Sequence, residues 1–367
     1  MTQRLDDLAT PALLVERGRL QANLRWAAEL TRDAGVHLRP HIKTHKSPDL
    51  ARLQREQGIA GITTATVAEA EVFVGAGFDD VFIAYPMVGE ARIGRLLALG
   101  QRARVACGVD HADQLAPLDR AAGRKGVCLE VVLEVDSGHH RCGLAPGPEL
   151  VDLGREVAAR EHLSLRGVYT HAGHAYTGES PEAIAGIGLA EGRIAVEAAD
   201  LLRKAGQAIE TVSVGSSPTL PHCAAVSGVT EVRPGNYALR DATQVALGAV
   251  TAERCALTVL ATVITVHGDR CVLDAGSKVL SQDRPAPGGR PLARHGLFSD
   301  RPGWTLARLS EEHGVVLLAE GAARPAVGER VRFVPNHACV AVNLASELVL
   351  VEGDEVLEHW PVAAKGR

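Results

Sequence analysis

The stretch RPHIKTHKS, residues 39–47, places two lysines and two histidines within nine residues. One interpretation is a solvated basic loop. The other is that one lysine is a chemical reagent, because an amine with a lowered pKa can form a Schiff base with a carbonyl group. Lys43 is the better candidate because it closely follows a predicted strand, whereas Lys46 lies further on and has an ordinary solvated interpretation. Partial burial and neighbouring positive charge would lower the pKa of Lys43 as this chemistry requires.

Two glycine-containing segments could hold a phosphate group. SVGSSPT at 213–219 and EVRPGNY at 231–237 combine glycines, which allow close backbone approach, with hydroxyls and free N–H groups. Each segment alone is first of all a turn signature. Taken together they favour a phosphate site, and a phosphate next to an imine-forming amine indicates pyridoxal phosphate as the cofactor.

A third pattern could bind a metal ion. His337 and Cys339 flank a single alanine in VPNHACVAVNL, residues 334–344. On an extended strand both side chains would point to the same face and could share one divalent ion. Imidazole with thiolate is a zinc-like donor set, and two protein ligands leave positions open for substrate or water. The short H-x-C motif also recurs by chance, so the pair alone does not establish a metal site.

The elements that must position these residues begin with an alternating pattern. Up to about residue 237, short β-rich runs start near residues 36, 61, 80, 104, 127, 165, 211 and 231, with helical segments between them. Eight strands alternating with helices predict an α/β fold with a (β/α)8 TIM-type barrel, whose sites form from the loops after the strands. Lys43 follows the first run, and the two glycine segments contain the seventh and eighth.

After about residue 250, β-branched runs joined by Gly, Asp and Pro turns predict a second, mostly antiparallel β domain. We therefore expect three parts: residues 1–15 as an N-terminal strand that joins the β domain, 16–250 as the barrel that binds pyridoxal phosphate, and 251–367 as the β domain that carries the metal site. The segment DRPAPGGRPLARHG, 283–296, is predicted to be a loop on the surface or on the substrate side.

Composition restricts the function further. The 367 residues carry a formal net charge of -5 and no basic stripe, which argues against nucleic acid as a partner and favours small metabolites. The chain has no apolar run long enough to span a membrane and no signal-peptide pattern at its start, so no membrane partner and a cytoplasmic location are expected. The seven cysteines are scattered without a CxxC pair, which predicts reduced thiols.

Ten blocks of the sequence resemble the D-serine dehydratase and D-threonine aldolase family of pyridoxal-phosphate enzymes, which share the alanine-racemase fold type. In order they are TPALLVE, RPHIKTHKS, TTATVAEAEVF, EVDSGHHRCG, THAGHAY, SVGSSPT, EVRPGNY, DAGSKVLSQDR, SEEHG and PNHACVAVNL. The resemblance covers nearly the whole chain. It implies a homodimer whose active sites involve both subunits, and a metal-assisted lyase that acts on small D-3-hydroxy amino acids.

The resemblance also implies roles for single residues. Lys43 would form the Schiff base with the cofactor, and His337 with Cys339 would bind a divalent metal ion, with zinc favoured and manganese or magnesium as alternatives. Arg141 resembles the arginine near the cofactor's phenolic oxygen, and Tyr176 an aromatic cofactor contact. The phosphate cradle would comprise Gly215, Ser216, Thr219, Gly235 and Asn236. The group facing the pyridine nitrogen stays unassigned, and NYALRD departs from the more aromatic segment that the family would lead one to expect.

A cysteine as second metal ligand resembles the D-serine dehydratase branch more than aldolases with aspartate there. We therefore predict D-serine dehydratase activity (D-serine ammonia-lyase), with D-threonine as a further substrate, giving a 2-oxo acid and ammonia. The alternatives are D-threonine aldolase and an aldolase or dehydratase of 3-hydroxy-D-aspartate. More distant ones are an amino-acid racemase, a decarboxylase and a non-catalytic cofactor carrier, none of which needs the His337 and Cys339 pair.

Overall fold

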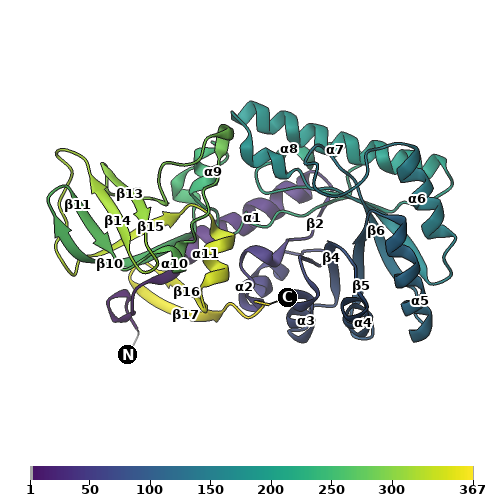
Figure 1. The fold of residues 1–367 in the computed structure, drawn as a ribbon, viewed down its shortest axis with the longest axis horizontal. Coiled ribbons are helices and arrows are strands. Elements are labelled where there is room, and N and C mark those ends of the chain that lie inside the picture. Colours follow the sequence, from purple (N-terminus) through teal and green to yellow (C-terminus); the bar gives the residue numbers. More distant parts are fainter. Residues whose placement is uncertain (1–2, 367) are drawn as a thin grey trace.

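The computed structural model describes residues 3–366, which form two joined parts, each built around its own sheet (Figure 1). One sheet has eight parallel strands in the order β2, β9, β8, β7, β6, β5, β4, β3. Their bounds are β2 (His37–Leu38), β3 (Ile62–Thr64), β4 (Asp80–Pro86), β5 (Arg104–Val109), β6 (Leu129–Glu134), β7 (Leu163–Tyr169), β8 (Thr211–Val214) and β9 (Glu231–Val232). A parallel bridge between His41 and Thr63 joins the two ends of this order, which closes the barrel.

The predicted barrel is confirmed, and each of the eight β-rich runs coincides with one of its strands. β5 and β6 each have five of six residues buried, because the strands lie between the barrel interior and the outer helices. The helices are α1 (Arg17–Asp33), α2 (Pro48–Arg55), α3 (Val67–Gly75), α4 (Glu90–Leu99), α5 (Leu115–Lys125), α6 (Pro148–Ala158), α7 (Pro181–Lys204) and α8 (Leu220–Cys223). Side-chain caps start some of them: Thr66 accepts a hydrogen bond from Glu69 N, and Ser180 from Ala183 N.

The second sheet is mostly antiparallel, as predicted. Its order is β13, β14, β11, β10, β1, β16, β17, and β15 pairs with β10 and β12. The bounds are β1 (Ala12–Glu16), β10 (Leu257–His267), β11 (Arg270–Leu273), β12 (Gly296–Leu297), β13 (Trp304–Leu309), β14 (Gly314–Leu318), β15 (Arg330–Pro335), β16 (Glu347–Glu352) and β17 (Glu355–Pro361). β1 lies inside this sheet, antiparallel to β10 and parallel to β16. Three short helices accompany it: α9 (Ala242–Ala246), α10 (Ser277–Leu280) and α11 (Ala338–Leu344).

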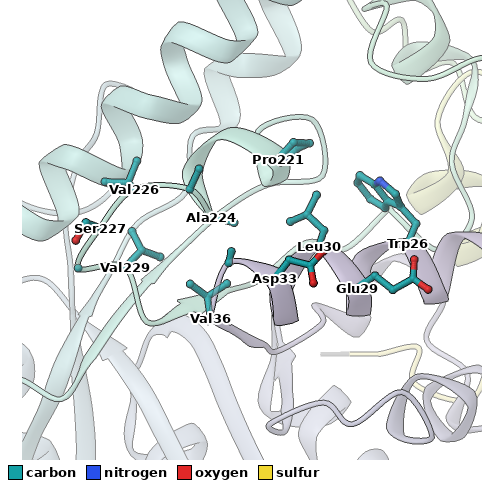
Figure 2. A pocket seen from close by; sticks show the side chains of 13 residues that line it. Trp26, Glu29, Leu30, Asp33, Val36, Pro221, Ala224, Val226, Ser227 and Val229 are labelled. Atoms are coloured by element: carbon teal, nitrogen blue, oxygen red, sulfur yellow. The ribbon is translucent and has the colours of Figure 1, made fainter.

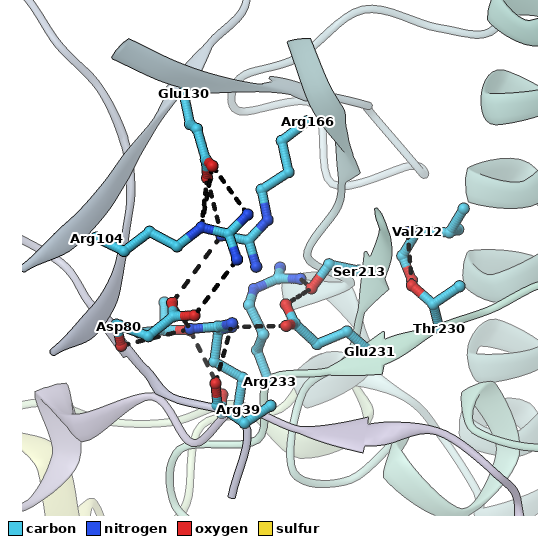
Figure 3. Close-up of polar contacts among 12 residues, drawn as sticks. Arg39, Asp80, Arg104, Glu130, Arg166, Val212, Ser213, Thr230, Glu231 and Arg233 are labelled. Atoms are coloured by element: carbon cyan, nitrogen blue, oxygen red, sulfur yellow. Dashed lines mark hydrogen bonds and ion pairs between the residues drawn. The ribbon is translucent and has the colours of Figure 1, made fainter. Parts of the chain in front are cut away.

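The barrel interior contains a charged network rather than apolar layers alone (Figure 3). Arg39, which is 1% exposed, donates to Glu231 Oε2 and Asp80 Oδ1, both at 2.6 Å. Glu231 Oε1 accepts a hydrogen bond from Ser213 Oγ at 2.6 Å, and Arg233 Nη1 donates to the same hydroxyl at 2.5 Å. Because each guanidinium has carboxylate or hydroxyl partners, these buried charges are compensated. The network ends at Arg233, which lines the cavity described below.

A hollow of about 860 Å³ lies between α1 and the segment that follows α8 (Figure 2). Trp26 and Val229 line it together with Glu29 and Asp33. It contains none of the residues predicted to carry chemistry. Among residues 3–366, no helix is both long and apolar enough to cross a membrane.

Candidate active site

A cavity of about 910 Å³ opens at the carboxyl ends of the barrel strands, where the loops after β2 to β9 meet the β domain. Nine of the ten predicted site residues line it: Lys43, Arg141, Tyr176, Gly215, Ser216, Gly235, Asn236, His337 and Cys339. The tenth, Thr219, is buried behind the loop, where its hydroxyl donates to Glu191 Oε2 at 2.9 Å and accepts from Ser216 N at 3.1 Å. Segments separated by up to three hundred residues therefore meet in one cavity.

Lys43 lies on a short 3₁₀ turn, Ile42–Thr44, which begins four residues after the end of β2 at Leu38. Burial lowers the pKa of its amine, Arg141 and Arg233 lower it further, and Cys339 and Glu69 oppose the shift. A lowered pKa makes a free amine more available at neutral pH. Lys46 differs, because its Nζ donates to Asn343 Oδ1 at 2.7 Å and lies 3.4 Å from Glu69 Oε1, and it does not line the cavity.

The local conformation predicted for the metal pair is wrong. β15 ends at Pro335, His337 is the N-cap residue of α11, and Cys339 lies in the first turn of that helix, so the two residues are not on an extended strand. Asp241, from a distant loop, accepts a hydrogen bond from Ala338 N at 3.0 Å, which caps the start of this helix. The two side chains nevertheless lie close enough for each to shift the pKa of the other.

Two neighbours hold the pair in place. Asp283 Oδ2 lies 2.5 Å from His337 Nδ1, which leaves Nε2 for another partner. The Thr44 hydroxyl lies 3.2 Å from Cys339 Sγ. Burial alone would lower the pKa of His337, but the hydrogen bond with Asp283 and the nearby Cys339 raise it to about 11. Burial alone would raise the pKa of Cys339, but its contacts with His337 and Thr44 lower it.

A thiolate held beside an oriented imidazole is a donor set that fits a divalent metal ion. Within residues 3–366, three His, Cys, Asp or Glu side chains come within 4.8 Å of one another at Asp110, Glu134 and Cys142 and nowhere else. His337 and Cys339 therefore bring no third ligand of this kind, and a metal ion there would keep open positions for substrate or water.

The two glycine segments form a cradle of small residues and backbone. Gly215 has φ +110°, a conformation that favours glycine, and a Cβ on Gly235 would lie 3.0 Å from Thr44 Oγ1. Among the described residues the buried Ser217 hydroxyl has no hydrogen-bond partner. An unpaired hydroxyl beside two loops without side-chain bulk fits a phosphate group.

Glu191 holds this cradle from behind, and no local pattern in the sequence indicated it. Its Oε1 accepts hydrogen bonds from Gly215 N at 2.9 Å and Ala172 N at 3.0 Å, from the middle of α7. Burial raises the pKa of Glu191, whereas these donors and Thr219 lower it. In the sequence it is one glutamate on a long amphipathic helix, where a solvent-facing role would be assumed.

Arg141 and Tyr176 complete the predicted set. Arg141 follows β6 on a loop that Asp136 shapes, because Asp136 Oδ1 accepts from Gly138 N at 2.9 Å and His140 N at 3.0 Å. Tyr176 belongs to the 3₁₀ turn Gly173–Thr177 after β7, and burial raises the pKa of its hydroxyl. Other residues that line the cavity were not predicted from the sequence, chiefly Arg233, Glu134 and Asp283. The place of each in the cavity depends on contacts between segments that are distant in the chain.

The chain matches two family descriptions: "Alanine racemase, N-terminal domain" over residues 15–241 and "Putative serine dehydratase domain" over residues 256–351. It is 36% identical to D-threo-3-hydroxyaspartate dehydratase of Delftia sp. (strain HT23), covering 98% of both chains. It is 32% identical to D-threonine aldolase of Arthrobacter sp, covering 97% of this chain and 93% of that one.

A solved structure of D-threo-3-hydroxyaspartate dehydratase, a variant with cysteine replaced by alanine in the metal-free form, superposes with a TM-score of 0.92. The identity is 33%, and the match covers 98% of each chain. The match to dehydratases and aldolases over both parts agrees with the barrel, the β domain and the cavity between them. The chain therefore belongs to the family of pyridoxal-phosphate lyases of the alanine-racemase fold that act on D-3-hydroxy amino acids.

Proposed function

We propose that this lyase is a metal-dependent dehydratase that converts D-serine to a 2-oxo acid and ammonia, with D-threonine as a further substrate. The observation that carries the proposal is Cys339, a thiol with a lowered pKa beside His337 in the cavity that Lys43 lines. A soft thiolate favours zinc over manganese or magnesium. A cytoplasmic homodimer is part of the same proposal, and sedimentation of the purified protein measures its oligomeric state.

Each residue has a defined task in this mechanism. Pyridoxal phosphate, when bound, supplies an electron sink for the bond broken at Cα, and a divalent metal ion supplies a Lewis acid for the β-hydroxyl. Lys43 holds the cofactor and, as a free amine, takes the proton from Cα of the substrate. His337 and Cys339 would hold the metal ion, and the substrate would be oriented with its β-hydroxyl on their side of the cavity.

The remaining residues bind and orient. Gly215, Ser216, Gly235 and Asn236 form the phosphate cradle, and Thr219 supports Ser216 from behind the loop. Tyr176 stays neutral because its pKa is raised, so it acts as a hydrogen-bond donor and an apolar wall rather than as a charge. Arg141 adds a positive charge beside Lys43, which lowers the pKa of that amine.

A second candidate substrate is 3-hydroxy-D-aspartate. Two observations favour it: the 36% identical dehydratase acts on D-threo-3-hydroxyaspartate by its name, and Arg92 and Arg141 line the cavity and could pair with a second carboxylate. The reaction would remain a dehydration, with the same roles for Lys43, His337 and Cys339.

The test is product analysis with D-serine, D-threonine and 3-hydroxy-D-aspartate, each with and without a metal chelator. Formation of 2-oxo acid and ammonia that the chelator abolishes supports the proposal, and the three rates rank the substrates. Glycine with an aldehyde would identify an aldolase with a cysteine ligand instead. Racemisation that survives the chelator would contradict a metal-dependent dehydratase.

A further inference from the structure

Two carboxylates, the buried Glu134 and the partly exposed Asp110, face the cavity and have no task in the mechanism above. Glu134 is the last residue of β6, and Asp110 follows β5. Tyr169 donates its hydroxyl hydrogen bond to Glu134 Oε2 at 2.6 Å. Asp110 accepts from Gln114 Nε2 at 2.7 Å and from Gly143 N at 3.0 Å. Both carboxylates line the cavity.

Glu134 lies near a second carboxylate, that of Asp110, and near one guanidinium, that of Arg141. Oxygen atoms of Glu134 and Asp110 lie within 4.8 Å of each other, and the cation nearest to Glu134 is Arg141, whose Nη2 lies 3.9 Å from Glu134 Oε1. Burial raises the pKa of Glu134, whereas Tyr169, Arg141 and Arg233 lower it. The groups that face Glu134 are Asp110 after β5, Arg141 and Cys142 after β6, Tyr169 at the end of β7 and Arg233 after β9.

Hydrogen bonds fix the backbone of the loop that carries Arg141, whereas the Arg141 side chain is about half exposed. Leu144 N donates to Glu134 O, and Asp136 N donates to Leu144 O, both at 3.0 Å, so the loop closes back on β6. The Arg141 side chain is 54% exposed. Among residues 3–366, Glu134 is the one residue whose carboxylate lies within 4.0 Å of the Arg141 guanidinium. Without that carboxylate, a long side chain at the cavity mouth would turn towards solvent.

We propose that Glu134 is a positioning residue: fixed by Tyr169, it holds the Arg141 guanidinium over the cavity, where the positive charge acts on Lys43. The inference rests on the proposed role of Lys43 as the residue that holds the cofactor. It assigns Glu134 no contact with substrate. Glu134 acts on Lys43 through the position of Arg141. Loss of the Glu134 carboxylate should therefore shift the titration of the Schiff base at Lys43 in the direction opposite to that expected from the loss of a nearby negative charge alone.

The test is Glu134→Gln in the cofactor-loaded protein, read as the pH titration of the visible Schiff-base absorbance. If Arg141 is released, its charge no longer disfavours the protonated form at Lys43, so the titration midpoint rises by about one unit. If Glu134 acted through its own charge alone, its removal would lower the midpoint. A lowered or unchanged midpoint therefore overturns the inference.

Matched variants sharpen this test. Glu130→Gln lies on the same strand and also removes an arginine partner, Arg104 at 2.8 Å, but it does not line the cavity and should leave the midpoint unchanged. Arg141→Ala should raise the midpoint as Glu134→Gln does, and the double variant should add nothing further. If Glu134→Gln does not fold, Tyr169→Phe removes the hydrogen bond that orients Glu134 and should shift the midpoint in the same direction.

The inference and the proposed function fail in different ways. If the wild-type protein lacks a Schiff-base absorbance that Lys43→Ala removes, the proposed function is wrong. If that absorbance is present and depends on Lys43, but Glu134→Gln does not raise its titration midpoint, the positioning role alone is wrong. A crystal structure of Glu134→Gln with Arg141 still over the cavity would also refute it.

Discussion

Removing the Asp283 carboxylate should weaken metal binding without touching either ligand. Asp283 Oδ2 lies 2.5 Å from His337 Nδ1, so it orients the imidazole and would make the other ring nitrogen, Nε2, a more basic ligand for the metal ion. Asp283→Ala removes both effects. Asp283→Asn keeps a hydrogen-bond acceptor but loses the charge, and should therefore fall between Asp283→Ala and the wild type.

The expected magnitude follows from exposure. Loss of such a hydrogen-bond partner typically costs about 10–100-fold in metal affinity. The side chains of His337 and Asp283 are 36% and 42% exposed, so water can replace part of the lost interaction. We therefore expect the lower end for Asp283→Ala, about tenfold, which is about 1.4 kcal/mol. Asp283→Asn should lose about threefold.

The assay is competition for zinc between the cofactor-loaded protein and a chromogenic chelator. Glu347→Gln is a matched control, because Glu347 Oε1 lies 3.1 Å from His359 Nδ1 in the β domain, with side-chain exposures of 48% and 39%, and neither residue lines the cavity. It should bind zinc as the wild type does. Wild-type zinc affinity in Asp283→Ala would refute the orienting role, and an equal loss in Glu347→Gln would show that the effect is not local.

Three further predictions concern Lys43, His337 and His45. Lys43→Ala should remove the visible absorbance of the bound cofactor, whereas Lys46→Ala should keep it; an unchanged spectrum in the first variant would assign the Schiff base to another lysine. His337→Ala should retain that absorbance and lose 2-oxo acid formation. Full activity of this variant would show that the mechanism does not require a metal ion at this site. Burial lowers the pKa of His45 to about 4 from an ordinary 6.5. Between pH 6.5 and about 4 the unfolded chain therefore binds more protons than the folded chain, so the free energy of unfolding should fall by up to roughly 3 kcal/mol as the pH is lowered through this interval. Urea unfolding at a series of pH values measures this loss, which should be smaller in His45→Gln. An equal dependence of the unfolding free energy on pH in both proteins would contradict the prediction.

Much of the barrel could be predicted because its signals are local. Runs of buried residues such as β5 are visible as nearly continuous apolar stretches, and turn residues separate them from helices. Once the strands are counted, the rule that sites form after their carboxyl ends places Lys43 and both glycine segments at one mouth. The cavity confirms that these segments meet there.

The conformation around His337 could not be predicted in the same way. The helix α11 starts where Asp241, 97 residues earlier in the chain, accepts the hydrogen bond of Ala338 N. Asp283 reaches His337 from a loop that carries only turn signals, and Glu191 reaches the phosphate cradle from the middle of a helix. Such contacts depend on the packing of the whole molecule, so no short window of sequence contains them.

The place of β1 in the second sheet has a consequence for how the chain is made. β1 lies between β10 and β16, so the segment synthesised early finds its neighbours only after residues 257–267 and 347–352 have left the ribosome. At roughly 5–20 residues per second, the delay before β16 arrives is on the order of 20–70 s. The barrel can fold during this time, while β1 has no strand partner and is accessible to chaperones. A single cut between the barrel and β10 would therefore not yield two complete folding units, because the β domain would lose an inner strand to the other fragment.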